Sequence, residues 1–258
     1  MSRIQKAFSD GKAFIAFVTC GDPDLGTTAE VVKAISAAGA GIIELGIPFS
    51  DPTAEGPVIQ GANMRALAGG VTTDKIFAMV AELRRDIDTP LVFMTYANVV
   101  FSYGTERFAD RCAEVGIDGL ILPDVPFEEK EEFAPAFRQR GIDFISLVAP
   151  TSCGRIAQIA KSAEGFLYIV SSLGVTGVRD GIATDIDAIV RQVREVTSIP
   201  CAVGFGISTP EQAAKMAAAS DGAIVGSAIV KLIAAHGREA PAVVGEYVRG
   251  MVAAVKGA

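Results

Sequence analysis

The stretch CAVGFGISTPEQAAKMAAASDGAIVGS, residues 201–227, contains a short apolar run, a glycine-rich turn, an amphipathic segment and a second apolar run. Thr209, Pro210 and Gln212 predict a helix start with an N-cap, a proline at the first helical position and a capping box. The flanking runs, 201–205 and 222–225, are short and apolar, which is typical of buried strands. The stretch therefore predicts one strand–helix–strand unit.

The same unit recurs along the chain, with eight apolar runs separated by amphipathic segments. Alternating strands and helices imply a parallel sheet with right-handed crossovers. Because no linker or change of composition interrupts the repeat, we expect one α/β domain, 1–258, folded as a closed (β/α)8 TIM barrel rather than an open sheet. Strands are expected at 14–19, 41–45, 91–95, 119–122, 144–148, 166–170, 201–205 and 222–225. Helices are expected near 27–39, 74–86, 105–115, 128–140, 153–162, 184–196, 209–219 and 239–255, with an extra N-terminal helix at 2–9 and a short extra helix at 227–234.

Glycine and proline mark the boundaries of some of these elements. Gly116 and Gly141 stand where helices should stop before the next strand. Pro135 falls inside the expected helix 128–140 and should kink or divide it.

The composition restricts the class of protein. Half of the 258 residues are hydrophobic, Trp is absent and the net charge is −7, which disfavours binding to nucleic acid or to anionic membranes. The start of the chain has no apolar signal segment and no run is long enough to span a bilayer, so a cytoplasmic location is expected. The four cysteines are scattered and His236 is the only histidine, placed near a helix end. No metal site is therefore expected.

Glycine-rich loops follow the last three expected strands. They are 174–177, 204–208 and 226–228. Glycines let backbone N–H groups approach an anion, and Ser227 could cap a helix whose N-terminus adds partial positive charge. Each loop could also be a simple tight turn, but together they indicate a phosphate site at the position usual for this type of barrel.

Glu44 ends an apolar strand, where a charge is costly unless it is paired or functional. A loop of some 17 residues is expected after it, to Asn63 or beyond, carrying Asp51 and Glu55. Burial would raise the pKa of Glu44 and suit it to general-acid work, while a more solvated second carboxylate could orient a proton. Alternatively, Glu44 forms a buried ion pair and the loop carboxylates are merely solvated.

Other polar and aromatic residues lie near expected strand ends. Asp124, between two prolines, could cap the following helix or contact a substrate or partner. Tyr96 and Asn98 follow the third strand. Tyr168 could face inward or outward, and Phe17 is expected in the core.

Taken together, these motifs resemble the α-subunit family of tryptophan synthases, along the whole chain and in the family's order. They are Gly-Asp-Pro at 21–23, Glu-Leu-Gly-Ile-Pro-Phe-Ser-Asp-Pro at 44–52, Gly-Pro-Val-Ile-Gln at 56–60, Tyr-Ala-Asn at 96–98, Asp-Val-Pro at 124–126, Gly-Val-Thr-Gly at 174–177, Gly-Phe-Gly-Ile-Ser at 204–208 and Gly-Ser-Ala-Ile-Val-Lys at 226–231.

The resemblance implies a lyase that cleaves indole-3-glycerol phosphate into indole and D-glyceraldehyde 3-phosphate in tryptophan biosynthesis. It implies no cofactor in this chain, and a partner β subunit that carries pyridoxal phosphate in an α2β2 heterotetramer. It assigns Glu44 and Glu55 to catalysis, Gly177, Gly206, Gly226 and Ser227 to the substrate phosphate, Phe17, Tyr168, Phe205 and Ile224 to the indole pocket, Thr176 to a mobile loop, and Pro48, Asp51, Asn98 and Asp124 to the face that meets the partner.

One residue departs from the family pattern, because Glu55 stands where the family usually has Asp. The extra methylene leaves a second interpretation open, a weakly active subunit that mainly binds and activates the β subunit. Other enzymes with this barrel fit less well. A Schiff-base aldolase would need a lysine at a strand tip, and a metal-dependent sugar-phosphate epimerase would need several histidines.

Overall fold

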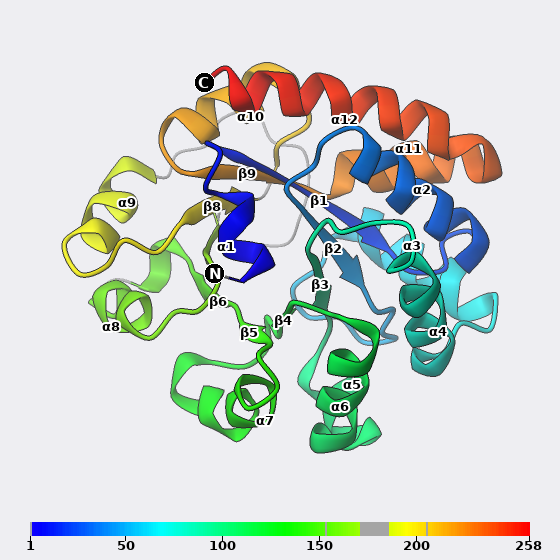
Figure 1. The fold of residues 1–258 in the computed structure, drawn as a ribbon, viewed down its shortest axis with the longest axis horizontal. Coiled ribbons are helices and arrows are strands. Elements are labelled where there is room, and N and C mark those ends of the chain that lie inside the picture. Colours follow the sequence, from blue (N-terminus) through cyan, green and yellow to red (C-terminus); the bar gives the residue numbers. More distant parts are fainter. Residues whose placement is uncertain (1, 153, 171–185, 205) are drawn as a thin grey trace.

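The computed structural model describes residues 2–152, 154–170, 186–204 and 206–258. In this part of the chain, nine parallel strands form one sheet in the order β5-β4-β3-β2-β1-β9-β8-β7-β6, with helices around its outside (Figure 1). The strands are β1 (Ala13–Thr19), β2 (Ile42–Gly46), β3 (Leu91–Met94), β4 (Gly119–Ile121), β5 (Asp143–Phe144), β6 (Ser146–Val148), β7 (Leu167–Val170), β8 (Cys201–Gly204) and β9 (Gly222–Val225).

The two end strands of this sheet, β5 and β6, are consecutive in the chain and are separated only by Ile145. The Ile145 N–H still donates to the Leu120 carbonyl at 2.9 Å. The expected fifth strand is thus a single run that pairs first with β4 and then with β7. The sheet is a nearly closed TIM barrel, as the eightfold repeat predicts.

The expected helices are present in the described residues, and two further α-helices, α3 and α5, and two short 3-10 helices, η2 and η3, were not expected. The structure contains α1 (Arg3–Ala7), α2 (Leu25–Ala37), α3 (Pro57–Ala68), α4 (Thr73–Leu83), α5 (Ala97–Tyr103), α6 (Thr105–Val115), the 3-10 helix η1 (Phe127–Glu132), α7 (Ala134–Arg138), η2 (Pro150–Ser152), α8 (Ile156–Lys161), α9 (Ile186–Arg194), α10 (Pro210–Ala218), α11 (Ser227–His236), η3 (Gly237–Glu239) and α12 (Ala240–Lys256).

The expected loop from Glu44 to Asn63 was wrong in length, because α3 begins at Pro57 behind the N-cap Gly56. A proline at the first helical turn is a start signal, and here it outweighs the weak amphipathic pattern. α5, directly after β3, was also missed. The prediction for Pro135 is confirmed, since the helical segment divides into η1 and α7 and Pro135 lies in the first turn of α7. Gly116 ends α6 in the left-handed conformation, as predicted.

The barrel interior is filled by side chains that alternate along the strands. Ile15, Ile42, Val92, Ile121 and Ile224 belong to one inner cluster, and their neighbours pack outward against the helices. Such alternation follows from the period of two in a strand. The N-terminal helix α1 lies over the centre of the barrel in Figure 1, and its fully buried Ile4 joins the inner cluster. α1 therefore closes the N-terminal end of the barrel.

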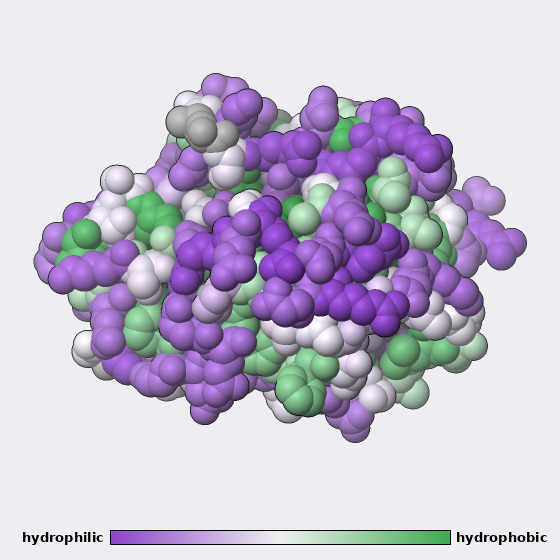
Figure 2. Space-filling model, turned by 60° about the horizontal axis from the view of Figure 1, so that its bottom comes forward, coloured by the Kyte–Doolittle hydropathy of each residue, from purple (hydrophilic) through white to green (hydrophobic). Residues whose placement is uncertain are grey.

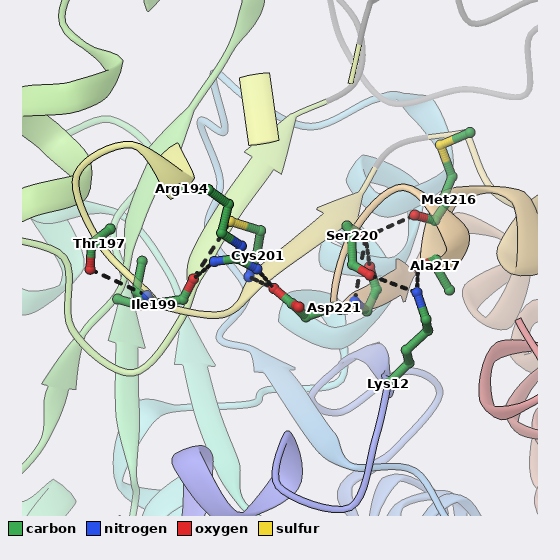
Figure 3. Close-up of polar contacts among 10 residues, drawn as sticks. Lys12, Arg194, Thr197, Ile199, Cys201, Met216, Ala217, Ser220 and Asp221 are labelled. Carbon is green, nitrogen blue, oxygen red and sulfur yellow. Dashed lines mark hydrogen bonds and ion pairs between the residues drawn. The ribbon is translucent and has the colours of Figure 1, made fainter. Parts of the chain in front are cut away.

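Polar groups at this N-terminal end are paired with one another (Figure 3). Asp221, before β9, accepts from Arg194 and from the Cys201 N–H, the latter at 2.7 Å. Lys12, before β1, donates to the carbonyls of Ala217 and Ser220. These contacts tie the segments beneath β1, β8 and β9 together.

The face of the molecule drawn in Figure 2 is predominantly polar. Apolar residues form small, separated patches on it. Among the described residues, the exposed large hydrophobic side chains are Met64, Leu67 and Phe101. No helix in the described part of the chain is long and apolar enough to cross a membrane. Cys20, Cys112 and Cys201 are buried free thiols, as expected.

Candidate active site

Glu44 lies on the inner face of β2, two residues beyond the inward-facing Ile42. In the sheet register it stands beside Phe17 of β1 and Val92 of β3. Only Leu45 and Gly46 follow it in the strand, so the carboxyl group lies near the C-terminal end of the barrel, where this fold carries its reactive groups.

The Glu44 carboxyl is 1% exposed, and its Oε1 atom has no hydrogen-bond partner among the described residues. In the same part of the chain, no cation forms an ion pair with it, so the structure does not support the buried ion pair considered above. Burial raises the pKa of Glu44 to about 8. The carboxyl group is therefore protonated at neutral pH, which is the state of a general acid.

Aromatic and aliphatic side chains surround this carboxyl. Phe17 is nearly buried and packs with Ile59 and Ala62 of α3 and Val230 of α11. Its ring lies where a side chain on Gly46 would be, 2.6 Å from the position of a Cβ, so the glycine leaves the space that Phe17 fills. Phe17 thus forms part of the apolar surroundings at the barrel mouth.

The sequence left open whether Tyr168 of β7 faces inward or outward. In the structure it faces the barrel interior. Burial raises its pKa well above the usual value, and the Glu44 charge raises it further, so the two groups lie within electrostatic reach of each other. Ile224 of β9 belongs to the same inner cluster. The structure therefore brings Glu44, Phe17, Tyr168 and Ile224 into one interior region.

Glu55 lies two residues before α3 and is partly buried. Its Oε2 accepts a hydrogen bond of 2.6 Å from Nδ2 of Asn63, and its backbone carbonyl accepts one of 2.7 Å from Nε2 of Gln60. Burial raises the pKa of Glu55 to about 7, while hydrogen bonds from Asn63 and the Tyr96 hydroxyl act in the opposite direction. Glu55 can therefore be ionised close to neutral pH.

Asn63 and Tyr96 are contacts of Glu55 that the sequence reasoning did not find. The signal for Asn63 was present, because Ile59, Ala62, Asn63 and Ala66 follow the spacing of one helix face and all are buried. A polar residue on such a face requires a partner. The signal was missed because α3 itself was not expected.

The loops after β8 and β9 contain the described part of the expected phosphate site. Gly206 has a φ of +77°, a conformation that favours glycine. Gly226 is the N-cap of α11, and both it and Ser227 are partly exposed. The capping role expected for Ser227 was wrong, since Ser227 is the first residue of the helix and no side chain caps it. Gly177, Thr176 and Phe205 lie outside the described residues.

The N-terminus of α11 nevertheless suits an anion. The first N–H groups of a helix have no partner within the helix and carry partial positive charge. The extra helix after the last strand is thus present where the sequence placed it. His236 is exposed at the last position of this helix, as expected.

The residues expected to meet a partner lie around the same end of the barrel. Asp51, Asn98 and Asp124 are exposed, whereas Pro48 is buried. Asp124 accepts from the Ala97 N–H through both oxygens at 3.1 Å, so it caps α5 and not the helix that follows it. The capping alternative considered for Asp124 named the wrong helix because α5 was not foreseen. On the same helix, Phe101 is 74% exposed.

A metal site of three or more His, Cys, Asp or Glu side chains is not found among the described residues. The described site instead contains two carboxyl groups of raised pKa, those of Glu44 and Glu55, at one end of the barrel.

Comparisons with known proteins agree with this geometry. Residues 4–255 match the family model described as tryptophan synthase alpha chain. The chain is 47% identical over 255 residues to the tryptophan synthase alpha chain of Lacticaseibacillus casei, covering 99% of this chain and 96% of that protein.

Solved structures give the same result. The chain is similar to tryptophan synthase subunit alpha from Legionella pneumophila with a TM-score of 0.89, 34% identity and full coverage of both chains. A chain of the tryptophan synthase α2β2 complex from Pyrococcus furiosus gives a TM-score of 0.83 at 34% identity, covering 94% of this chain and 99% of that one. A family match over nearly the whole sequence, with relatives and structures of the same length, shows that this chain belongs to the tryptophan synthase alpha chain family.

Proposed function

We propose that this chain cleaves indole-3-glycerol phosphate into indole and D-glyceraldehyde 3-phosphate by a retro-aldol reaction. The observation that carries the proposal is Glu44, a buried carboxyl at the C-terminal end of the barrel, one oxygen of which has no partner among the described residues. Family membership supplies the substrate, and Glu44 supplies the acid that the reaction needs.

Glu44 begins the reaction by giving its proton to carbon C3 of the indole ring. The ring becomes cationic, which weakens the bond between C3 and C3′ of the glycerol chain. When this bond breaks, its electron pair returns to the ring and restores indole. The C3′ hydroxyl becomes the aldehyde and gives its proton to the Glu44 carboxylate. Glu44 is thereby protonated again, and the proton balance closes.

Glu55 serves the opposite side of the ring in this proposal. Its carboxylate accepts a hydrogen bond from the indole N–H and stabilises the positive charge that develops there. A pKa of about 7 leaves a substantial ionised fraction at neutral pH, which this role requires. The different environments of Glu44 and Glu55 thus separate an acid from an acceptor.

The rest of the substrate would be held by the residues around these carboxylates. Gly206, Gly226 and Ser227 offer backbone donors to the phosphate, and Gly177 is assigned to the same role by the resemblance. Phe17, Tyr168 and Ile224 would contact the indole ring together with Phe205. Thr176 would belong to a segment that orders over the bound substrate.

We also propose that the C-terminal end of the barrel binds a tryptophan synthase β subunit. Pro48, Asp51, Asn98 and Asp124 lie on this side, and the exposed Phe101 adds an apolar contact. The β subunit would carry pyridoxal phosphate, and this chain would need no cofactor for its own step. Co-elution of this chain with a β subunit, weakened by Phe101→Ala, would test the assignment.

The reaction itself is tested by indole release from indole-3-glycerol phosphate. Glu44→Gln should lower kcat by about 100- to 10,000-fold, the usual contribution of a general acid–base residue. Glu55→Gln should also lower kcat, and phosphate-ligand binding should persist in both variants. Normal indole release by Glu44→Gln would refute the proposed function, and normal release by Glu55→Gln would refute the role of Glu55.

A further inference from the structure

The Glu55 carboxyl is held by side chains from two separate elements. Asn63 of α3 donates to Oε2 at 2.6 Å, and the Tyr96 hydroxyl, at the start of α5, also hydrogen-bonds to the carboxyl. Both residues are nearly buried, at 4% and 2% exposure. Their positions are therefore fixed by packing before any ligand binds.

Asn63 is held by the helix that carries it. It lies on the inner face of α3 with Ile59, Ala62 and Ala66, and two of these pack against Phe17. A side chain with few torsions on a packed helix face loses little entropy on forming its hydrogen bond. Asn63 thus fixes Oε2 of Glu55 relative to the barrel mouth.

Tyr96 approaches the carboxyl from the other element and is itself held in place. Its hydroxyl accepts from the Ala54 N–H at 3.1 Å, and its ring packs against Phe49 with centroids 5.2 Å apart. Because the oxygen accepts from Ala54, its proton is available for Glu55. The tyrosine therefore binds the residue before Glu55 and the Glu55 side chain at once.

We propose that Asn63 and Tyr96 are positioning residues that fix the Glu55 carboxylate and thereby allow a glutamate to act at this position. A glutamate has one more rotatable bond than an aspartate, and two fixed donors at its carboxyl remove that freedom. This inference rests on the proposed function for its catalytic consequence, but the fixed carboxylate is a property of the free protein.

The charges around Glu55 determine the sign of the expected pH effect. Burial raises the pKa of Glu55, while Asn63 and the Tyr96 hydroxyl lower it by hydrogen bonding. Burial raises the pKa of Tyr96, and the charges of Glu55 and Asp124 raise it further, so the tyrosine stays a neutral donor. Removing a donor should therefore raise the pKa of Glu55 and move the acidic limb of the rate profile to higher pH.

Asn63→Leu tests the inference, because leucine has a similar shape and fits the apolar face of α3. We expect kcat to fall about 10- to 100-fold with KM changed less than about threefold, as expected when a catalytic group is misplaced. The acidic limb of kcat/KM should rise by about one pH unit. Tyr96→Phe keeps the ring and should produce a smaller shift in the same direction.

Gln60→Leu is the matched control. The Gln60 side chain donates a hydrogen bond of similar length to the backbone carbonyl of Glu55, not to its carboxyl group. The leucine variant removes this bond and leaves the contacts of the carboxyl intact. It should leave the acidic limb in place. If Asn63→Leu folds poorly, Asn63→Asp serves as the second variant, because aspartate has the same shape as asparagine. It puts two carboxyls in contact, and its acidic limb should lie above that of the wild type.

The titration of Glu55, followed by carbon NMR of its carboxyl in the free protein, separates this inference from the proposed function. A higher pKa in Asn63→Leu supports the inference even if the wild type releases no indole, a result that would remove the proposed function alone. An active wild type whose kcat, acidic limb and Glu55 titration are all unchanged by Asn63→Leu would overturn the inference.

Discussion

At the N-terminal end of the barrel, Asp118 accepts from Arg84 at 2.5 Å, from Arg3 at 3.1 Å and from the Leu91 N–H at 2.9 Å. At the C-terminal end, Glu44 is more deeply buried, yet one of its oxygens has no partner in the described part of the chain. The same fold thus contains a carboxylate with three donors and, among the described residues, a more deeply buried carboxyl whose Oε1 has none.

The difference between Asp118 and Glu44 indicates that the two ends of the barrel have different tasks, one in stability and the other in function. Pairing offsets part of the cost of burying a charge. The polar contacts beneath β1, β4, β8 and β9 connect neighbouring segments. Burial keeps the Glu44 carboxyl neutral, and a carboxyl with a pKa raised in this way is typical of a functional site. In this barrel the N-terminal end stabilises the fold, and the C-terminal end retains reactive groups.

Asp118→Ala removes the carboxylate that pairs with its neighbours at the N-terminal end of the barrel. This variant should show a large loss of stability. It leaves Arg84, which is 11% exposed, with an unmatched charge, and removes the acceptor of the Leu91 N–H. Breaking a buried pair costs about 3 kcal/mol, so urea unfolding should show a loss of that order. The kcat of the folded fraction should stay unchanged.

The exposed pair Arg85–Glu82 provides the control, with side chains 72% and 66% exposed. Glu82→Ala should change the free energy of unfolding by less than about 0.5 kcal/mol. A large fall in kcat for Asp118→Ala, or equal stability losses in the two variants, would contradict the division between the two ends.

The sequence was sufficient to predict most of this architecture. The repeat predicted the barrel. The extra helices expected at 2–9 and 227–234 are found at 3–7 and 227–236, and Glu44 lies near the end of its strand as expected. These features depend on local periodicity and on turn residues, which the sequence displays directly.

Contacts between elements could not be predicted in the same way. Asn63 and Tyr96 meet at Glu55 although they are 33 residues apart in the chain, and Asp124 caps a helix that begins 27 residues before it. No local pattern encodes such contacts. The missed helices α3 and α5 hid them further, since the weak pattern of α3 and the short length of α5 gave little periodic signal.

The pH dependence of kcat/KM tests the roles proposed for Glu55 and Glu44 at the C-terminal end of the barrel. Glu55 must be ionised, and its pKa is about 7, so activity should fall below that pH. Glu44 must be protonated, and its pKa is about 8, so activity should fall above that pH. The profile should be a narrow bell between these values, falling about tenfold per pH unit on each side. A flat profile from pH 6 to 9 would contradict both roles.

Replacing Glu44 should also reveal how much its burial costs at each pH. Its pKa rises from 4.5 to about 8 on folding, so the folded state retains a proton that the unfolded state loses over this range. A raised pKa contributes stability below the unfolded value, and this contribution is lost as pH rises toward the folded value. Glu44→Gln has no such proton.

The stability advantage of Glu44→Gln should therefore grow by about 1 kcal/mol per pH unit between pH 5 and 8 and be small below 4.5. Urea unfolding of both proteins across this range measures it, with Glu82→Gln as the exposed control. An advantage that does not change with pH would mean that Glu44 has a partner when folded. In that case the two ends of the barrel would not differ in the way described. A growing advantage, together with lost indole release, would mean that the same buried carboxyl lowers stability and supplies the catalytic proton.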